Sequence, residues 1–211
     1  MTERSFFAAR GRVVAALVGA GLLLSACQGG GPTPGNSPTA SSSSASPSAS
    51  PTPTPSAKYI PASAKGKAQN VPVPVKPALA DQNSKAGLEA FTTYWFALLN
   101  YGYETGDLKT WKSITSPQCL FCSNLESGID ADYSTGGWQV GGLIQTPKVE
   151  VTTPSADALQ KVTVQVVQTA ATSYKAGGTR GTSNPPGNDA VVVLAAFKNG
   201  VWAVSDMHPL G

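Results

Sequence analysis

Cys119 and Cys122 form a Cys-x-x-Cys motif, which is the pair of residues in this sequence best suited to chemical reaction. At the start of a predicted helix, the Cα atoms of residues i and i+3 lie close to the distance that a disulfide requires. The same motif at a helix N-terminus can lower a thiol pKa and carry thiol–disulfide exchange. Turn-like residues before the motif, and the bulky Leu120 and Phe121 inside it, favour a structural disulfide. A thiol–disulfide oxidoreductase is the alternative.

His208 is the one histidine in the sequence and stands near its end. It could act as a general base, with Asp206 two residues earlier. Glu126 and Asp130 are spaced i, i+4 on a predicted helix, with Asp132 nearby, and paired carboxylates can also perform acid–base chemistry. An ordinary tail residue and a solvated helix face are the simpler interpretations, so we expect no catalytic residue.

Metal and cofactor sites are not predicted either. A zinc site needs about four ligands, and two cysteines with one distant histidine do not supply them. The sequence also lacks a Gly-rich phosphate loop, a Gly-x-Ser-x-Gly elbow and a metal-binding helix motif. We therefore expect neither a metal nor a cofactor.

Five aromatic residues are candidates for the wall of a ligand pocket. Small-molecule sites are lined mainly by apolar and aromatic side chains, although most aromatic residues in a domain of this size simply fill its core. The candidates are Tyr94, Trp95, Tyr133, Trp138 and Trp202.

Residues 1–27 have the pattern of a lipoprotein signal peptide. Three arginines precede an uncharged, mostly apolar run at 13–24. That run is shorter than the roughly 20 residues that span a bilayer, and it fits the apolar region of a signal peptide. Leu24-Ser25-Ala26-Cys27 then resembles the bacterial lipobox. The resemblance implies cleavage before Cys27, diacylglyceryl on its thiol, and anchoring at the extracytoplasmic face of the cell membrane.

Residues 28–83 are expected to form a disordered stalk. Of the 26 residues at 32–57, 24 are Pro, Ser, Thr or Ala, and none is charged. Such a segment buries too little apolar surface to offset the entropy lost on ordering. Residues 58–80 are still rich in proline, and two interpretations remain open for them. They are either linker or an extended segment that packs along the domain before its first helix.

The positive charge of the chain is not on its expected folded part, residues 84–211. The whole sequence has a formal net charge of +3, but residues 84–211 carry ten acidic and eight basic side chains. A nucleic-acid-binding domain concentrates positive charge on its folded surface. We therefore exclude nucleic acid as a partner.

The apolar residues of the first half of this domain have helical spacing. The spacing predicts a helix from an N-cap at Ser84 to about residue 103 and a short second helix capped by Asp107. A third is expected to start at Ser116-Pro117 and to end at Gly136-Gly137.

After residue 137 the period changes to two, which predicts strands at 138–152, 161–173 and 190–197, followed by one from 201 to 205. Gly141-Gly142 predicts a bend, Asn199-Gly200 predicts a hairpin, and 176–188 is expected to be a mobile loop. The fold class is therefore α+β, with three N-terminal helices packed on a curved antiparallel sheet of about four strands.

Several short motifs of the folded part occur in an order that resembles an uncharacterised family of actinobacterial lipoproteins, classed as a domain of unknown function. The resemblance covers about residues 77–211. The order of helices before strands is also similar to the nuclear transport factor 2-like (cystatin-like) cone. The resemblance implies a long helix across a curved sheet with a pocket between them, but no activity, because cone folds host many functions. The motifs are Phe91-Thr92-Thr93-Tyr94-Trp95, Leu99-Asn100-Tyr101, Thr105-Gly106-Asp107, Cys119-Leu120-Phe121-Cys122 and Gly136-Gly137-Trp138.

These observations predict a non-enzymatic binding module at the outer face of the membrane. Its partner would be an envelope protein, the cell wall or a small apolar ligand. The alternatives are a cone-fold enzyme that uses His208 or a pocket carboxylate, and a thiol–disulfide oxidoreductase that uses Cys119 and Cys122.

Overall fold

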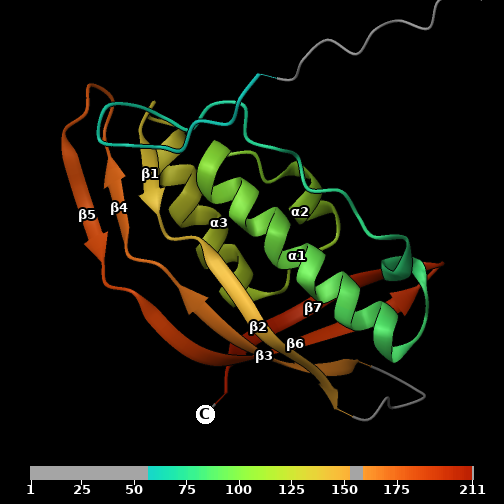
Figure 1. The fold of residues 1–211 in the computed structure, drawn as a ribbon. Coiled ribbons are helices and arrows are strands. Elements are labelled where there is room, and N and C mark those ends of the chain that lie inside the picture. The colour runs from blue at the N-terminus through green and yellow to red at the C-terminus, as the bar shows by residue number, and fades with distance from the viewer. Residues whose placement is uncertain (1–56, 153–158, 211) are drawn as a thin grey trace, which may run out of the picture. The chain divides into compact units, whose positions relative to one another are not determined.

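The computed structural model describes residues 57–152 and 159–210, which form an α+β fold with antiparallel strands, as expected (Figure 1). The predicted signal peptide, Cys27 and the stalk up to residue 56 lie outside the described residues. The helical elements are the 3-10 helix η1 (Ala78–Asp81), α1 (Lys85–Thr105), α2 (Lys109–Ser113) and α3 (Leu120–Tyr133). The strands are β1 (Trp138–Gly141), β2 (Ile144–Thr152), β3 (Gln160–Gln168), β4 (Ala171–Tyr174), β5 (Arg180–Asn184), β6 (Gly187–Lys198) and β7 (Val201–Pro209).

Helix α1 begins and ends where its local signals predict. The Ser84 hydroxyl accepts a hydrogen bond from the Gly87 N–H at 3.0 Å, which confirms Ser84 as the N-cap. Gly106 ends the helix in the left-handed conformation with φ 77°. Because buried residues lie on a wide face of this helix, α1 can cover much of the sheet.

Helix α3 begins at Leu120, so the expected start at Ser116-Pro117 is wrong. The Ser116 N–H donates to the carbonyl oxygen of Val204 at 2.7 Å, and Thr115 forms a parallel bridge with Val204. This pairing holds the chain extended against β7. Cys119 therefore becomes the N-cap of the helix.

The described strands form two sheets, whereas the sequence predicted about four strands in one. Their orders are β2-β3-β6-β7 and β1-β4-β5. Three chain segments pass through both sheets and are interrupted at 142–143, 169–170 and 185–186. Gly141 and Gly142 have φ of 73° and 77°, which confirms the predicted bend, and Pro185-Pro186 removes two backbone donors from the ladder.

The expected mobile loop at 176–188 instead contains β5 and the first residues of β6. Strand β5 pairs only with β4 among the described strands, and most of its residues are exposed. An exposed edge strand needs no apolar side chains, so its polar sequence has no apolar alternation to detect. The Asn199-Gly200 hairpin is confirmed, with positive φ at both residues.

Residues 57–83 pack with the domain, so the expected domain boundary at residue 84 is too late. The Trp138 indole N–H donates to the Ser63 carbonyl at 2.8 Å, and the Trp202 indole N–H donates to the Gln82 carbonyl at 3.0 Å. Ala80 in η1 is only 1% exposed. Buried indoles need acceptors for their N–H groups, and this proline-rich segment supplies two. Of the two interpretations for 58–80, the structure shows the packed segment.

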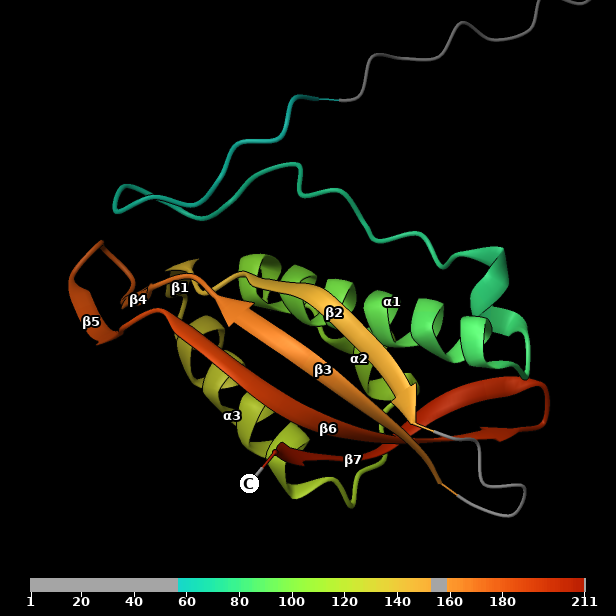
Figure 2. The ribbon, with the colours of Figure 1, turned by 60° about the horizontal axis from the view of Figure 1, so that its bottom comes forward.

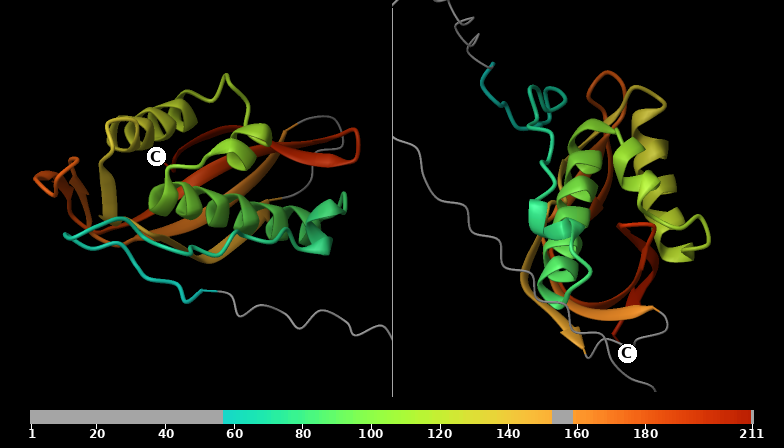
Figure 3. Two further views of the ribbon diagram at one scale, coloured as in Figure 1. Left: turned by 90° about the horizontal axis from the view of Figure 1, so that it is seen from above. Right: turned by 90° about the vertical axis from the view of Figure 1, so that its right-hand side faces the viewer.

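Helices α1 and α3 lie on the same side of the four-stranded sheet (Figures 2 and 3). The sheet contributes alternate valines to the core, and Val162, Val164 and Val193 are fully buried. The side-chain amide of Asn100 in α1 bonds both the N–H and the carbonyl of Ile144, each at 2.8 Å. This paired contact fixes α1 to the first residue of β2.

We predict that Gly106→Ala destabilises the protein by about 1–3 kcal/mol. Gly106 has φ 77°, and a Cβ there would lie 2.5 Å from Cγ of Tyr133. Urea unfolding of the variant measures the change. Gly128→Ala is the matched control, because Gly128 lies inside α3 and a Cβ there would have no neighbouring atom within 4 Å. That change should raise stability by about 0.5–1 kcal/mol. Equal effects of the two substitutions would contradict the packing described for α1 and Tyr133.

Candidate functional site

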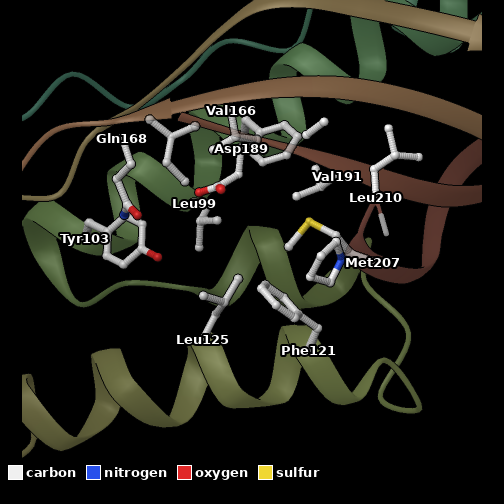
Figure 4. Close-up of a pocket in the computed structure, with 14 residues that line it drawn as sticks. Leu99, Tyr103, Phe121, Leu125, Val166, Gln168, Asp189, Val191, Met207 and Leu210 are labelled. Atoms are coloured by element: carbon white, nitrogen blue, oxygen red, sulfur yellow. The ribbon is translucent and has the colours of Figure 1, made fainter. Parts of the chain in front are cut away.

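A cavity of about 420 Å³ lies between α1, α3 and the facing strands β2, β3, β6 and β7 (Figure 4). Its wall is mostly apolar, and its volume falls within the range of small-molecule sites. The lining residues are Phe96, Leu99, Tyr103, Phe121, Leu125, Ile144, Val166, Gln168, Asp189, Ala190, Val191, Met207, Pro209 and Leu210.

The spacing of residues along α1 and α3 determines which helical side chains line the cavity. Phe96, Leu99 and Tyr103 follow one another at spacings of three and four on α1, so they share one face. Phe121 and Leu125 are spaced i, i+4 on α3 and are partly buried. The two helices therefore present apolar side chains to the same space.

The pairing of the strands determines which of their side chains line the opposite wall. Val166 of β3 lies directly opposite Asp189 of β6, and Val164 lies opposite Val191. Opposed residues of an antiparallel pair project to the same face. Met207 of β7 is 3% exposed and adds a flexible thioether to this wall.

The polar groups of the wall gather at one end of the cavity. Figure 4 shows the Tyr103 hydroxyl, the Gln168 amide and the Asp189 carboxylate on one side, with Phe121 and Met207 on the other. Burial raises the pKa of Tyr103, and a hydrogen bond with Gln168 partly offsets that rise. Tyr103 is thus a neutral phenol near pH 7, able to donate or accept a hydrogen bond.

Gln168 is held in place by the bend between β1 and β2. Its side-chain N–H donates to the Gly142 carbonyl at 2.8 Å. Asp189 lies at the exposed rim. Among the described wall residues, Asp189 has the one acidic side chain, and none is Lys, Arg or His.

Tyr133 does not line the cavity but forms a hydrogen bond with a residue that does. Its hydroxyl donates to the backbone carbonyl of Tyr103 at 2.7 Å, and burial raises its pKa to about 12. The Lys67 ammonium lies 5.5 Å from the centre of its ring. Tyr133 therefore joins α1, α3 and the segment before η1.

None of the five aromatic residues expected to line a pocket is in the wall of this cavity. Trp95 is fully buried against Phe96 and Trp111, and Trp202 packs against Phe91 and Phe197. The other three are also placed elsewhere: Tyr94 is a buried core residue, Tyr133 bonds the backbone of Tyr103, and Trp138 stacks on Tyr174. Their bulk suits the core, so the wall is built mainly from smaller aliphatic side chains.

The disulfide between Cys119 and Cys122 is present, with a Cα–Cα distance of 5.2 Å. Cys119 is 0% exposed and Cys122 is 2% exposed. The Cys122 N–H donates to Sγ of Cys119 at 3.1 Å, which caps α3. Both sulfur atoms belong to buried residues, whereas a redox centre must meet its substrate at an accessible sulfur. The geometry therefore favours a structural disulfide.

The predicted acid–base candidates are not brought together at the cavity. His208 is about half exposed on β7 and lies 3.8 Å from Oδ2 of Asp206. Glu126 pairs with Lys112, and Asp130 is exposed. Burial raises the pKa of Asp132, with a hydrogen bond from Ser173 acting in the opposite direction. In the part of the chain that the structure describes, no group of three or more His, Cys, Asp or Glu residues could hold a metal ion.

The sequence did not single out Gln168 and Asp189, although strand alternation contains the signal. Val162, Val164 and Val166 share a face of β3, and the next residue on that face is Gln168. On β6, Val193 and Val191 lead to Asp189 in the same way. A polar residue that ends an inward-facing apolar series lies at the rim of the core.

None of the helices formed by residues 57–152 and 159–210 is both long enough and apolar enough to cross a membrane.

No curated protein matches the chain. One similar solved structure is the intermembrane space region of the chloroplast protein ARC6, with 9% identity and a TM-score of 0.44, over 62% of this chain and 98% of that one. Another is an uncharacterised protein with a cystatin-like fold from Caulobacter vibrioides, with 14% identity and a TM-score of 0.35, over 56% and 81%.

The family model of DUF6318, a family of unknown function, matches residues 57–208. This range includes the segment before η1 together with all the helices and almost all of the strands described above. The chain belongs to the DUF6318 family.

Proposed function

We propose that this protein is a non-enzymatic binding module of the cell envelope, and that its cavity takes a small, mainly apolar ligand. The observation that carries the proposal is the cavity of about 420 Å³ between α1, α3 and the sheet. Apolar side chains from two helices and four strands converge on it, and a few polar groups gather at one end. Such a combination is typical of small-molecule sites.

The polar groups of the cavity favour binding over catalysis. A hydrolase or isomerase needs a nucleophile or a general base held beside a second polar group. Tyr103 is a neutral phenol and Gln168 an amide that is hydrogen-bonded to the backbone. Asp189, the one carboxylate among the described wall residues, lies at the exposed rim, where water competes for the position that a substrate proton would need. These groups can orient a ligand through hydrogen bonds, which is the role we assign to them.

The proposal also includes lipid on Cys27 and the nuclear transport factor 2-like cone as the fold. The lipobox at 24–27 supports the first, and the passage of α1 across a curved sheet supports the second. Twenty-nine residues lie between Cys27 and residue 57, where the family match begins. Fully extended at about 3.1 Å per residue, they would reach about 90 Å from the membrane surface. We further propose an actinobacterial source, on the motifs quoted above.

A neutral apolar dye tests the cavity. N-phenyl-1-naphthylamine should bind saturably with a rise in fluorescence, because the cavity removes it from water. Leu125→Trp fills the space from α3 and should weaken binding at least ten-fold. Fluorescence titration of purified protein measures the affinity.

Leu120→Trp is the matched control, because Leu120 is in the same helix but is 74% exposed. It should leave dye affinity unchanged. Val166→Phe fills the cavity from β3 and should weaken dye binding as Leu125→Trp does. Agreement between the two variants would show that the loss comes from filling the cavity and not from a local change in α3. If the filled variants bind the dye as well as the control, the cavity is not the site.

Mass spectrometry of the mature N-terminus tests the anchor. In a host that processes bacterial lipoproteins, we expect a chain that begins at Cys27 and carries the mass of a diacylglyceryl group. Cys27→Ala should abolish both the modification and recovery in the membrane fraction. An unmodified Cys27 on protein with the native sequence would overturn this part of the proposal.

A further inference from the structure

Asp189 supplies an unbalanced negative charge to the polar end of the cavity. Among residues 57–152 and 159–210, its carboxylate has no ion-pair partner. The described wall contains no Lys, Arg or His that could neutralise it. The charge is therefore available to whatever occupies the cavity.

Strand pairing holds this charge close to the apolar part of the wall. Asp189 lies directly opposite Val166, and the next residue on the same face of β6 is Val191, which is 8% exposed. A ligand whose body lies against Val166 and Val191 would thus place its polar end beside the carboxylate.

Tyr103 and Gln168 add neutral oxygen atoms at the same end. A phenol oxygen, an amide oxygen and a carboxylate all accept hydrogen bonds, and an ammonium group donates three. A carboxylate or phosphate on the ligand would instead meet Asp189 as a like charge. The site is complementary to a cation.

We infer that the ligand is an amphiphile with an apolar body and a cationic head, such as a primary ammonium group, which pairs with Asp189. The inference rests on the proposed binding function and names the chemical class of its ligand. Because Asp189 lies at the exposed rim, water screens the pair, and the contribution of the charge to affinity is modest. We expect it to change affinity by about two- to five-fold.

Three probes of equal chain length test the inference: octylammonium, 1-octanol and octanoate. Each is titrated against the dye-loaded protein at pH 7 and low ionic strength. Octylammonium should displace the dye at a concentration about two- to five-fold lower than octanol, and octanoate should be the weakest. Asp189→Asn should remove the preference for octylammonium while octanol binds as before. High salt should reduce the preference in the unmodified protein.

Asp130→Asn is the control, because it removes an exposed carboxylate of α3 outside the cavity wall. It should keep the preference for octylammonium. If octanol binds but octylammonium has no advantage, or if the advantage survives in Asp189→Asn, the inference is wrong while the binding function stands. If neither the dye nor any probe binds, the proposed function fails, and the inference fails with it.

Discussion

The separation of α3 from the sheet is the constraint on which the cavity depends. Before the helix, the chain is pinned to β7, because the Ser116 N–H bonds the Val204 carbonyl at 2.7 Å. At its other end, the Tyr133 hydroxyl bonds the Tyr103 carbonyl of α1 at 2.7 Å. The Cys119–Cys122 disulfide fixes the first turn between these two points. A helix held at both ends cannot settle onto the sheet, so Phe121 and Leu125 border a space that the protein does not fill.

The unfilled space beside α3 is an exception to the close packing of the rest of the domain. Protein interiors are close-packed, and side chains that face an unfilled space lose dispersion contacts. Most of the core satisfies that rule, with Trp95, Val162 and Val193 fully buried. The side chains of Leu125 and Val166 instead face unfilled space. The polar end of the cavity, formed by Tyr103, Gln168 and Asp189, borders the same space. A ligand there would restore the missing contacts and use the polar groups for orientation.

Local signals in the sequence predicted the elements well and the site poorly. Ser84, Asn199-Gly200 and Gly141-Gly142 act through the backbone of their immediate neighbours, so the N-cap, the hairpin and the bend could be predicted from residue types. The start of α3 could not, because Ser116 bonds Val204, which is 88 residues away in the sequence. The large aromatic residues suggested a pocket, but their size suits the core. Asp189 and Gln168 become site residues only through the pairing of β3 with β6, a non-local contact.

Methyl NMR of the purified protein under xenon pressure tests most directly whether the space between α3 and the sheet is open. Xenon enters apolar cavities in proteins and shifts the resonances of nearby methyl groups. We predict saturable shifts for Leu99, Leu125 and Val166, with little change at the exposed Leu120 and Val201. Shifts of similar size at both sets of methyl groups, or none at Leu99, Leu125 and Val166, would show that side chains close the space and would contradict an open cavity.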